Sequence, residues 1–354
     1  MTERALATIR QIAEIKTHTN ADSLELAIVD GWQVVVKKGE FLAGDLVVFF
    51  EIDSVLPVRE EFEFLRKCCY LNREWLEGGE GFRLKTIRLR KELSQGLVLA
   101  VADVMNAKLF TMNSAIGTDV TELLGVTKWD PPVAACLSGM ARGNFPSFIQ
   151  KTDQERVQNC WNRIKEKYSG LEWEASIKLD GTSCSIYHNN GTVGVCSRNL
   201  DLKLEGNDEN TYIQMAVKHN LLEGLKALGY NIAIQGEVMG PGIQGNQEQL
   251  KEAELFVFDI FLIDDQRHAT PAERNLILLQ LATQQGIVLR QAPVIDCVTL
   301  DQFETIQDIL KHAEGPSLNS PAREGVVYKA VAVVDGQVPS FKVISNEWLL
   351  LNDG

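Results

Sequence analysis

The middle of the chain reads Ala175-Ser176-Ile177-Lys178-Leu179-Asp180-Gly181-Thr182-Ser183, a run of small and apolar residues that contains one lysine and one aspartate. The run predicts a strand that ends near Lys178, and Gly181 permits a sharp turn directly after it. Side chains two residues apart on an extended backbone point to the same side. We therefore expect the amine of Lys178 and the carboxylate of Asp180 to lie together beside a tight turn.

The lysine of this stretch is a candidate nucleophile. Burial among apolar neighbours favours the neutral form of a lysine, and a neutral lysine attacks phosphorus or carbonyl carbon. Asp180 would hold a metal ion, or the waters of that ion, beside the atom under attack. An ordinary surface turn can carry the same residues, so Lys-x-Asp-Gly alone does not decide between the two interpretations. The rest of the chain has to decide.

The composition is that of a globular protein with room for two or three domains. The chain has 354 residues, of which 45% are hydrophobic and 23% charged. Its net charge of -13 disfavours bulk electrostatic binding to nucleic acid but allows a local basic groove. Seven cysteines without Cys-x-x-Cys or zinc-type spacing predict reduced thiols, and so a cytoplasmic protein, or a nuclear one in a eukaryote. The sequence has no apolar run long enough to predict a membrane-spanning segment.

The first hundred residues predict a small β-barrel. Short strands are expected at residues 5–15, 24–29, 32–36, 46–50 and 96–101, separated by turn pairs such as Asp30-Gly31. The sequence from residue 20 to residue 49 resembles the OB-fold of tRNA-binding modules. Barrels of this class bind single-stranded or irregular nucleic acid.

A basic stripe follows at residues 82–91, Phe-Arg-Leu-Lys-Thr-Ile-Arg-Leu-Arg-Lys, in an otherwise acidic chain. On an extended strand Arg83 and Lys85 would share one face, as would Arg88 and Arg90. The stripe is a candidate surface for nucleic acid. Charge runs of this kind are also typical of a solvated amphipathic strand, and both interpretations stay open.

A change in composition predicts the division into domains. Residues 126–150 are rich in proline and glycine, which predicts a linker between an OB-fold domain at residues 1–125 and a second domain at residues 151–354. In the second domain a first helix is expected at residues 152–167, with Thr152 or Asp153 as its N-cap. The further expected strands are 171–178, 184–188, 192–197, 231–239, 255–262, 325–331 and 340–344, and the expected helices are 211–219, 221–227, 271–285 and 300–314. A hairpin signal at Asn189-Asn190-Gly191 favours an α+β fold with antiparallel sheets.

A glycine-rich loop at residues 240–245 matches the Gly-x-Gly-x-x-Gly pattern of dinucleotide sites. We reject that interpretation, because Pro241 lies within the turn, the next helix would be short and polar, and no βαβ alternation surrounds the loop. The segments around it are more informative. Each of them alone is more often a core strand with a polar end.

Five such segments follow Lys178 in a fixed order. They are Ser197-Arg198-Asn199, Gln235-Gly236-Glu237, Leu255-Phe256-Val257-Phe258-Asp259-Ile260, Glu324-Gly325-Val326-Val327-Tyr328-Lys329 and Phe341-Lys342-Val343. Together with the stretch around Lys178 they resemble the motifs of the covalent nucleotidyltransferases, the superfamily of nucleic-acid ligases and mRNA-capping enzymes. Residues 236–244 resemble the RNA ligase version. With an OB module in front, the chain resembles RNA ligases of the Deinococcus and Naegleria type.

The resemblance implies an ATP-dependent RNA ligase for RNA repair. Such an enzyme joins 3'-hydroxyl and 5'-phosphate ends, here expected at nicks in RNA or RNA/DNA duplexes, through a lysyl-AMP intermediate and an AMP-capped 5'-end. By resemblance the catalytic residues are Lys178, Asp180, Glu324 and Lys342; the ATP contacts are Lys178, Arg198, Glu237 at the ribose, Phe258 at the adenine, Lys329, Lys342 and Arg156; and the ligands of Mg2+ or Mn2+ are Asp180, Glu324 and Glu237. Ile344 departs from the family pattern, which commonly has a second basic residue there. No particular protein partner is predicted.

Two other classes of protein share parts of this pattern. A DNA ligase or a GTP-using capping enzyme uses the same lysine chemistry, and the nucleotide and the acceptor would tell them apart. A catalytically inactive nucleic-acid-binding protein would keep the OB-fold, but the chain retains the lysine and the carboxylates that only chemistry requires.

Overall fold

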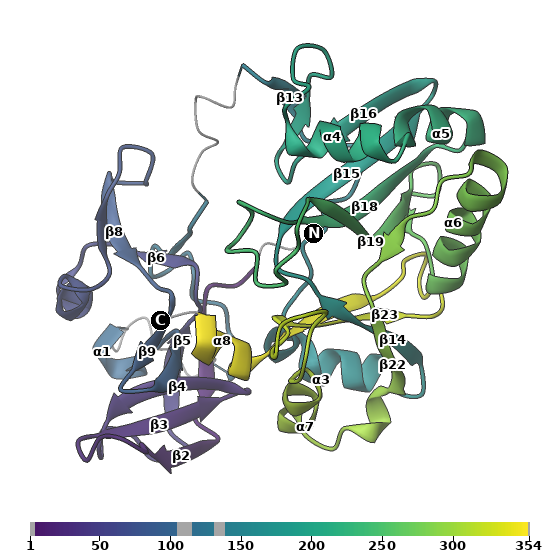
Figure 1. Ribbon diagram of the computed structural model, residues 1–354. Helices are drawn as coiled ribbons and strands as arrows, with labels where there is room; N and C mark the ends of the chain where they lie inside the picture. Colours follow the sequence, from purple (N-terminus) through teal and green to yellow (C-terminus); the bar gives the residue numbers. More distant parts are fainter. Residues whose placement is uncertain (1–3, 105–114, 131–138, 353–354) are drawn as a thin grey trace. The chain divides into compact units, whose positions relative to one another are not determined.

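The computed structural model describes residues 4–104, 115–130 and 139–352, which fold as two compact units (Figure 1). One unit comprises Met1–Pro132 with Leu349–Gly354, and the other comprises Val133–Trp348. The domain boundaries expected from composition stay a prediction, since part of the expected linker, residues 131–138, lies outside the described residues.

The N-terminal unit consists mainly of short antiparallel strands. Its described strands are β1 (Ala7–Gln11), β2 (Glu14–Thr17), β3 (Leu24–Val29), β4 (Trp32–Lys37), β5 (Leu46–Phe50), β6 (Ser54–Leu56), β7 (Tyr70–Asn72), β8 (Glu80–Arg83), β9 (Thr86–Leu89), β10 (Glu92–Gln95), β11 (Leu97–Ala100) and β12 (Thr127–Lys128), with the short helices η1 (Glu60–Leu65) and α1 (Val101–Val104). They pair in the orders β1-β5-β11, β2-β3-β4, β9-β10 and β12-β6-β8-β7. Strand β5 lies between two cores, because Val48 and Phe50 pack into one and Val47 and Phe49 into the other.

The basic stripe is not one extended strand. The prediction that Arg88 and Arg90 share one face of a strand is therefore wrong. Strand β8 ends at Arg83, which separates Arg83 from Lys85 as well. The chain reverses at Arg90 and Lys91, whose φ angles of 47° and 75° form the turn between β9 and β10. The cations are therefore distributed over a strand end and a hairpin.

The larger unit contains two sheets that are antiparallel except for one short pair. The eight-stranded sheet has the order β13 (Ala141–Asn144), β17 (Leu200–Leu202), β16 (Thr192–Cys196), β15 (Thr182–Asn189), β18 (Ile232–Met239), β19 (Glu254–Leu262) and β20 (Arg267–His268), with β21 (Arg290–Gln291) parallel to β19. The four-stranded sheet has the order β22 (Val294–Thr299), β14 (Glu172–Lys178), β23 (Gly325–Ala330) and β24 (Ser340–Ile344). The predicted α+β fold with antiparallel sheets is confirmed.

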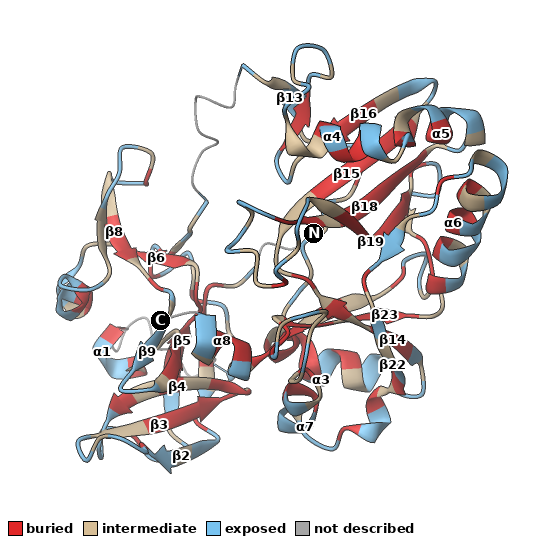
Figure 2. Ribbon diagram, viewed as in Figure 1, coloured by how far each residue is buried: buried red, intermediate tan, exposed pale blue. Residues whose placement is uncertain are grey.

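Helices cover these sheets. Figure 2 shows buried residues along β15 and β18, and these strands share one core with α4 (Thr211–Lys218), α5 (Leu221–Leu228) and α6 (Pro271–Gln285). A second core joins the four-stranded sheet to α3 (Val157–Lys167) and α7 (Ile306–His312). The chain ends with α8 (Asn346–Asn352). Among the described residues, no helix combines the length and the apolar character that crossing a membrane requires.

Several local predictions are confirmed and two need correction. Asn190 and Gly191, with φ angles of 49° and 81°, form the two-residue turn of the β15–β16 hairpin. The first helix starts at Val157, five residues later than expected, because the preceding backbone pairs with β24 and Glu155 O accepts a hydrogen bond from Lys342 N at 2.8 Å. The helix expected at residues 300–314 is divided by a new start at Thr305, whose side chain and that of Asp308 form a capping box.

Candidate active site

The candidate site lies where the chain passes from one sheet to the other. Strand β14 ends at Lys178 and strand β15 begins at Thr182, so Asp180 and Gly181 lie in the crossing. A Cβ atom on Gly181 would lie 2.4 Å from the carbonyl oxygen of Val238, which only a glycine avoids. The Gly181 amide donates to Glu237 Oε1 at 3.1 Å. The turn predicted after Lys178 therefore also fixes a carboxylate of β18.

A cavity of about 330 Å3 opens at this crossing. That volume is in the range of small-molecule sites. Eight of the nine predicted site residues line it: Lys178, Asp180, Arg198, Glu237, Phe258, Glu324, Lys329 and Lys342. They come from strands and loops that are far apart in the sequence, and the fold brings them to one place.

The amine of Lys178 is held inside the cavity by Glu324. Lys178 Nζ lies 2.5 Å from Glu324 Oε2, and the two side chains are 26% and 14% exposed. The pairing of β14 with β23 places Lys178 opposite Gly325, directly after Glu324. A Cβ on Gly325 would lie 2.1 Å from Val343 O, so a glycine is required for this close approach. The ammonium must lose its proton and leave this ion pair before it can act as a nucleophile.

The pKa values of Lys342 and Glu237, which also line the cavity, are shifted toward neutrality. Burial, together with the charges of Lys178 and Arg156, lowers the pKa of Lys342 to about 8. Burial raises the pKa of Glu237 to about 7, and the carboxylate of Glu324 acts in the same direction. Lys342 thus lies near two other cations, and Glu237 lies near a second carboxylate, so a bound phosphate chain and a bound cation would relieve repulsion between like charges.

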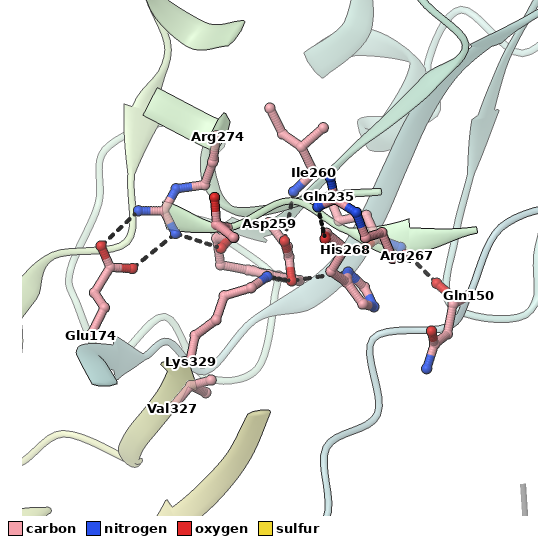
Figure 3. Close-up of polar contacts among 12 residues, drawn as sticks. Gln150, Glu174, Gln235, Asp259, Ile260, Arg267, His268, Arg274, Val327 and Lys329 are labelled. Carbon is pink, nitrogen blue, oxygen red and sulfur yellow. Dashed lines mark hydrogen bonds and ion pairs between the residues drawn. The ribbon is translucent and has the colours of Figure 1, made fainter. Parts of the chain in front are cut away.

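A buried polar network joins the two sheets beside the cavity (Figure 3). Asp259 of β19 forms an ion pair with Lys329 of β23, and His268 Nδ1 lies 3.1 Å from the same carboxylate. Burial alone would raise the pKa of Asp259, but the charges of Lys329 and His268 hold it below its usual value. Lys329 therefore reaches the cavity with its ammonium already paired.

A second ion pair continues this network. Arg274 of α6 donates to both carboxylate oxygens of Glu174 of β14, at 2.9 and 3.0 Å. Arg274 also donates to the carbonyl oxygen of Phe258 at 3.3 Å, which fixes the backbone of the predicted adenine contact. Both members of the pair line the cavity.

Sequence reasoning assigned no role to Glu174, Arg274, His268 or the carboxylate of Asp259. The sequence pattern could have indicated a role for two of these residues, Glu174 and Asp259. Glu174 precedes Lys178 by four residues on one strand, so both point to one side, and Asp259 is the one acid inside an apolar strand. The partners Arg274 and His268 carry no such signal.

Arg198 lines the cavity from an exposed position, whereas Arg156 and Ile344 do not line it. Arg198 is 66% exposed and pairs with Asp153 at 2.8 Å, so this aspartate is a partner of Arg198 and not the expected N-cap. Arg156 does not line the cavity; it is the N-cap of α3, and its backbone bridges to Lys342. Ile344 is buried opposite Gly325. In the described chain, the cations that line the cavity are Lys178, Arg198, Arg274, Lys329 and Lys342.

The carboxylates suit a hard divalent cation. Asp180, Glu237 and Glu324 all line the cavity, and carboxylate oxygens are ligands that Mg2+ and Mn2+ prefer. Over residues 4–104, 115–130 and 139–352, no three His, Cys, Asp or Glu side chains lie close enough to hold a metal by themselves. The residues therefore fit an ion that keeps water or phosphate oxygens among its ligands.

Comparisons with known proteins cover nearly the whole chain. A family model described as an OB-fold domain matches residues 6–101, and one described as RNA ligase matches residues 171–344. The structure of Naegleria gruberi RNA ligase with PPi is 42% identical, with 98% of each chain covered and a TM-score of 0.80. A mutant of that ligase with AMP and Mn is also 42% identical, with 98% of each chain covered and a TM-score of 0.82. Another mutant, with ATP and Mn, is 42% identical and covers 97% of this chain and 98% of its own, with a TM-score of 0.81. No curated protein matches the chain.

Proposed function

Because the chain belongs to the RNA ligase family, we propose that this ATP-dependent RNA ligase seals 3'-hydroxyl and 5'-phosphate ends at nicks in RNA or RNA/DNA duplexes. The observation that carries the proposal is the cavity in which the amine of Lys178 meets carboxylates, cations and Phe258. The relatives with ATP, AMP and PPi bind the molecules that such a reaction starts from and produces.

In the first step, Lys178 Nζ attacks the α-phosphorus of ATP. A nitrogen–phosphorus bond forms, the bond between the α-phosphorus and the bridging oxygen breaks, and pyrophosphate leaves with the electron pair. The amine loses its proton on the way, so the ion pair with Glu324 has to open. The product is lysyl-AMP.

The other residues of the cavity bind the nucleotide and stabilise charge. Phe258 stacks on the adenine, Glu237 accepts a hydrogen bond from the ribose, and Lys342 faces the α-phosphate. Such groups accelerate the step when they lie where negative charge develops. Lys329 acts mainly through its charge, because its ammonium is paired with Asp259. Arg198 faces the phosphates. Arg156 does not line the cavity and acts there through its charge, which contributes to the lowered pKa of Lys342.

A divalent cation, Mg2+ or Mn2+, would neutralise phosphate charge and orient the leaving group when bound. Asp180, Glu237 and Glu324 would hold it, together with water or phosphate oxygens. Glu324 holds the ammonium of Lys178 in the free enzyme, and the amine has to leave this carboxylate before it attacks.

The next two steps return the lysine to its starting state. A 5'-phosphate oxygen of the RNA attacks the adenylate, the nitrogen–phosphorus bond breaks, and an AMP-capped 5'-end forms. The 3'-hydroxyl then attacks the 5'-phosphorus, a phosphodiester bond forms, and AMP leaves. Both displacements use the same cavity.

A sealing assay with nicked duplexes tests the substrate. The strands beside the nick are varied between RNA and DNA, and either ATP or GTP is supplied. We expect sealing with ATP and with RNA on the 3'-hydroxyl side. Efficient sealing of an all-DNA nick would indicate a DNA ligase, and use of GTP without strand joining would indicate a capping enzyme. No product under any condition would indicate the inactive binding protein.

We further propose that the enzyme acts in the cytoplasm, or in the nucleus if its source is a eukaryote. The six described cysteines are free thiols, which suits a reducing compartment. Fractionation of the cells that produce the protein tests this.

A further inference from the structure

The N-terminal unit carries two tryptophans in contact at its surface, Trp75 and Trp129. Their ring centroids are 4.8 Å apart, with an angle of 60° between the ring planes. The chain has six tryptophans, all within the described residues, and the other four are buried. Apolar surface left in contact with water is unfavourable, so a pair of large rings kept partly exposed is a candidate binding surface.

An arginine of the basic stripe lies over this pair. The guanidinium carbon of Arg83 is 4.1 Å from the ring centroid of Trp129, a cation–π contact. Arg83 Nη2 also forms an ion pair with Asp53 Oδ1 at 3.6 Å. Among the described residues, Arg83 Nε is buried without a hydrogen-bond partner. The ion pair and the ring contact together hold the guanidinium beside the two rings.

The four-stranded sheet of this unit fixes these groups. Arg83 is the last residue of β8 and pairs with Val55 of β6, which pairs on its other side with Thr127 of β12. Trp129 follows Thr127 by two residues, and its amide donates to Asp53 O at 2.8 Å, so the pairing continues and Trp129 emerges on the face of Arg83. A rigid sheet thus presents the ring and the cation together.

We propose that Trp75, Trp129 and Arg83 bind an unpaired nucleobase of the RNA on which this ligase acts. The inference rests on the proposed function for the identity of the nucleic acid. Base stacking on aromatic rings with an adjoining arginine is how proteins hold single strands without reading their sequence. Stacking does not depend on net charge, which suits a chain with a net charge of -13.

RNA binding by the full chain tests this site. The affinity for a short fluorescent single-stranded RNA, and for a blunt duplex of the same sequence, is measured by fluorescence anisotropy. Trp129→Ala is expected to weaken single-strand binding by roughly 5- to 150-fold, as loss of one stacking contact does. Trp129→Phe should retain most of the affinity, and the blunt duplex should be much less affected.

The matched control is Phe64→Ala, which removes an aromatic side chain that is 58% exposed on η1 in the same unit. It should bind RNA like the wild type. Trp75→Ala provides a second variant should Trp129→Ala unfold, which a thermal melt would show. Unchanged single-strand affinity in a folded Trp variant, or an equal loss with the blunt duplex, overturns the proposal.

Formation of lysyl-AMP separates this proposal from the proposed function. It is measured without RNA, as label that the chain takes up from ATP with a radioactive α-phosphate. If the wild type takes up label normally and the Trp variants bind single strands as the wild type does, the protein is a ligase without this base site. If the wild type takes up no label but the Trp variants lose RNA binding, the base site is present and the proposed ligase chemistry is wrong.

Discussion

Lys342 carries a charge that changes near physiological pH. Its pKa is lowered to about 8 by burial and by the charges of Lys178 and Arg156, so the free enzyme loses this cation as the pH rises through that value. If Lys342 binds a phosphate of ATP, the affinity for ATP should fall above pH about 8. Lys342→Arg keeps its charge at any such pH, so its ATP affinity should stay constant there. Equilibrium binding of ATP on both sides of that pH measures the difference.

The control is Lys342→Met, which should bind ATP weakly at every pH and should slow the labelling step by about 100-fold, as loss of one charge-stabilising contact does. If the wild type and Lys342→Arg showed the same decline, a group other than Lys342 would be titrating. An unchanged labelling rate in Lys342→Met would remove this residue from the mechanism.

At the residue scale, the sequence predicted the side chains whose chemistry is distinctive. Lys178, Glu237 and Glu324 were found because each belongs to a short motif that contains a glycine, and the structure explains two of those glycines, Gly181 and Gly325, by contacts of 2.4 and 2.1 Å that a Cβ would make. It could not predict which charges pair with one another. Glu174 and Arg274 are 100 residues apart, and no local pattern joins them.

The crossing between the two sheets tolerates little change. A Cβ on Gly181 would lie 2.4 Å from a backbone oxygen of β18, which a rotamer change cannot relieve. Gly181→Ala should therefore destabilise the chain by about 1–3 kcal/mol, as overpacking does, and should slow labelling because it displaces the amide that binds Glu237. Chemical denaturation and the labelling rate measure the two effects.

Gly143→Ala in β13 is the matched control, since nothing lies within 4 Å of the added Cβ and the residue is also in a strand. It should leave both quantities close to wild type. Equal stability of the two variants would mean that the crossing has more room than the structure indicates.

The ion pair between β19 and β23 contributes to the rigidity of the larger unit. Asp259→Asn would leave the ammonium of Lys329, whose side chain is 6% exposed, without its charged partner. Breaking one partner of a buried pair costs about 3–5 kcal/mol, so we expect a loss of that order in the free energy of unfolding. The double variant Asp259→Asn with Lys329→Met should recover part of the loss. A loss in the double variant equal to the sum of both single losses would show that the two groups do not interact.

At the element scale, regular elements were predictable where their pattern is long. Helix α6 has the ends that its pattern predicted, and in the structure Thr270 and Glu273 form a capping box at its start and Gly286 ends it. The start of α3 was missed because β24 pairs with the backbone before Val157, and a tertiary contact overrides a local N-cap signal. Strands β6, β7 and β12 were missed because two or three residues are too few to show alternation.

At the scale of the whole molecule, the order of the motifs was sufficient to predict the fold. An OB-fold followed by an α+β domain was expected, and the comparisons and the sheet topology confirm both. The net charge of -13 misleads when it is taken as a property of the whole surface. The cations that matter lie in the cavity and beside Trp129, where local geometry and not net charge decides what binds.

The central claim is that Lys178 becomes covalently attached to AMP. The full chain is incubated with divalent cation and ATP or GTP that carries a radioactive α-phosphate, and the products are separated by denaturing electrophoresis. We expect label on the wild type from ATP and not from GTP, release of that label by added pyrophosphate, and no label on Lys178→Ala. Label that persists in Lys178→Ala, or a wild type that takes up none, would contradict it.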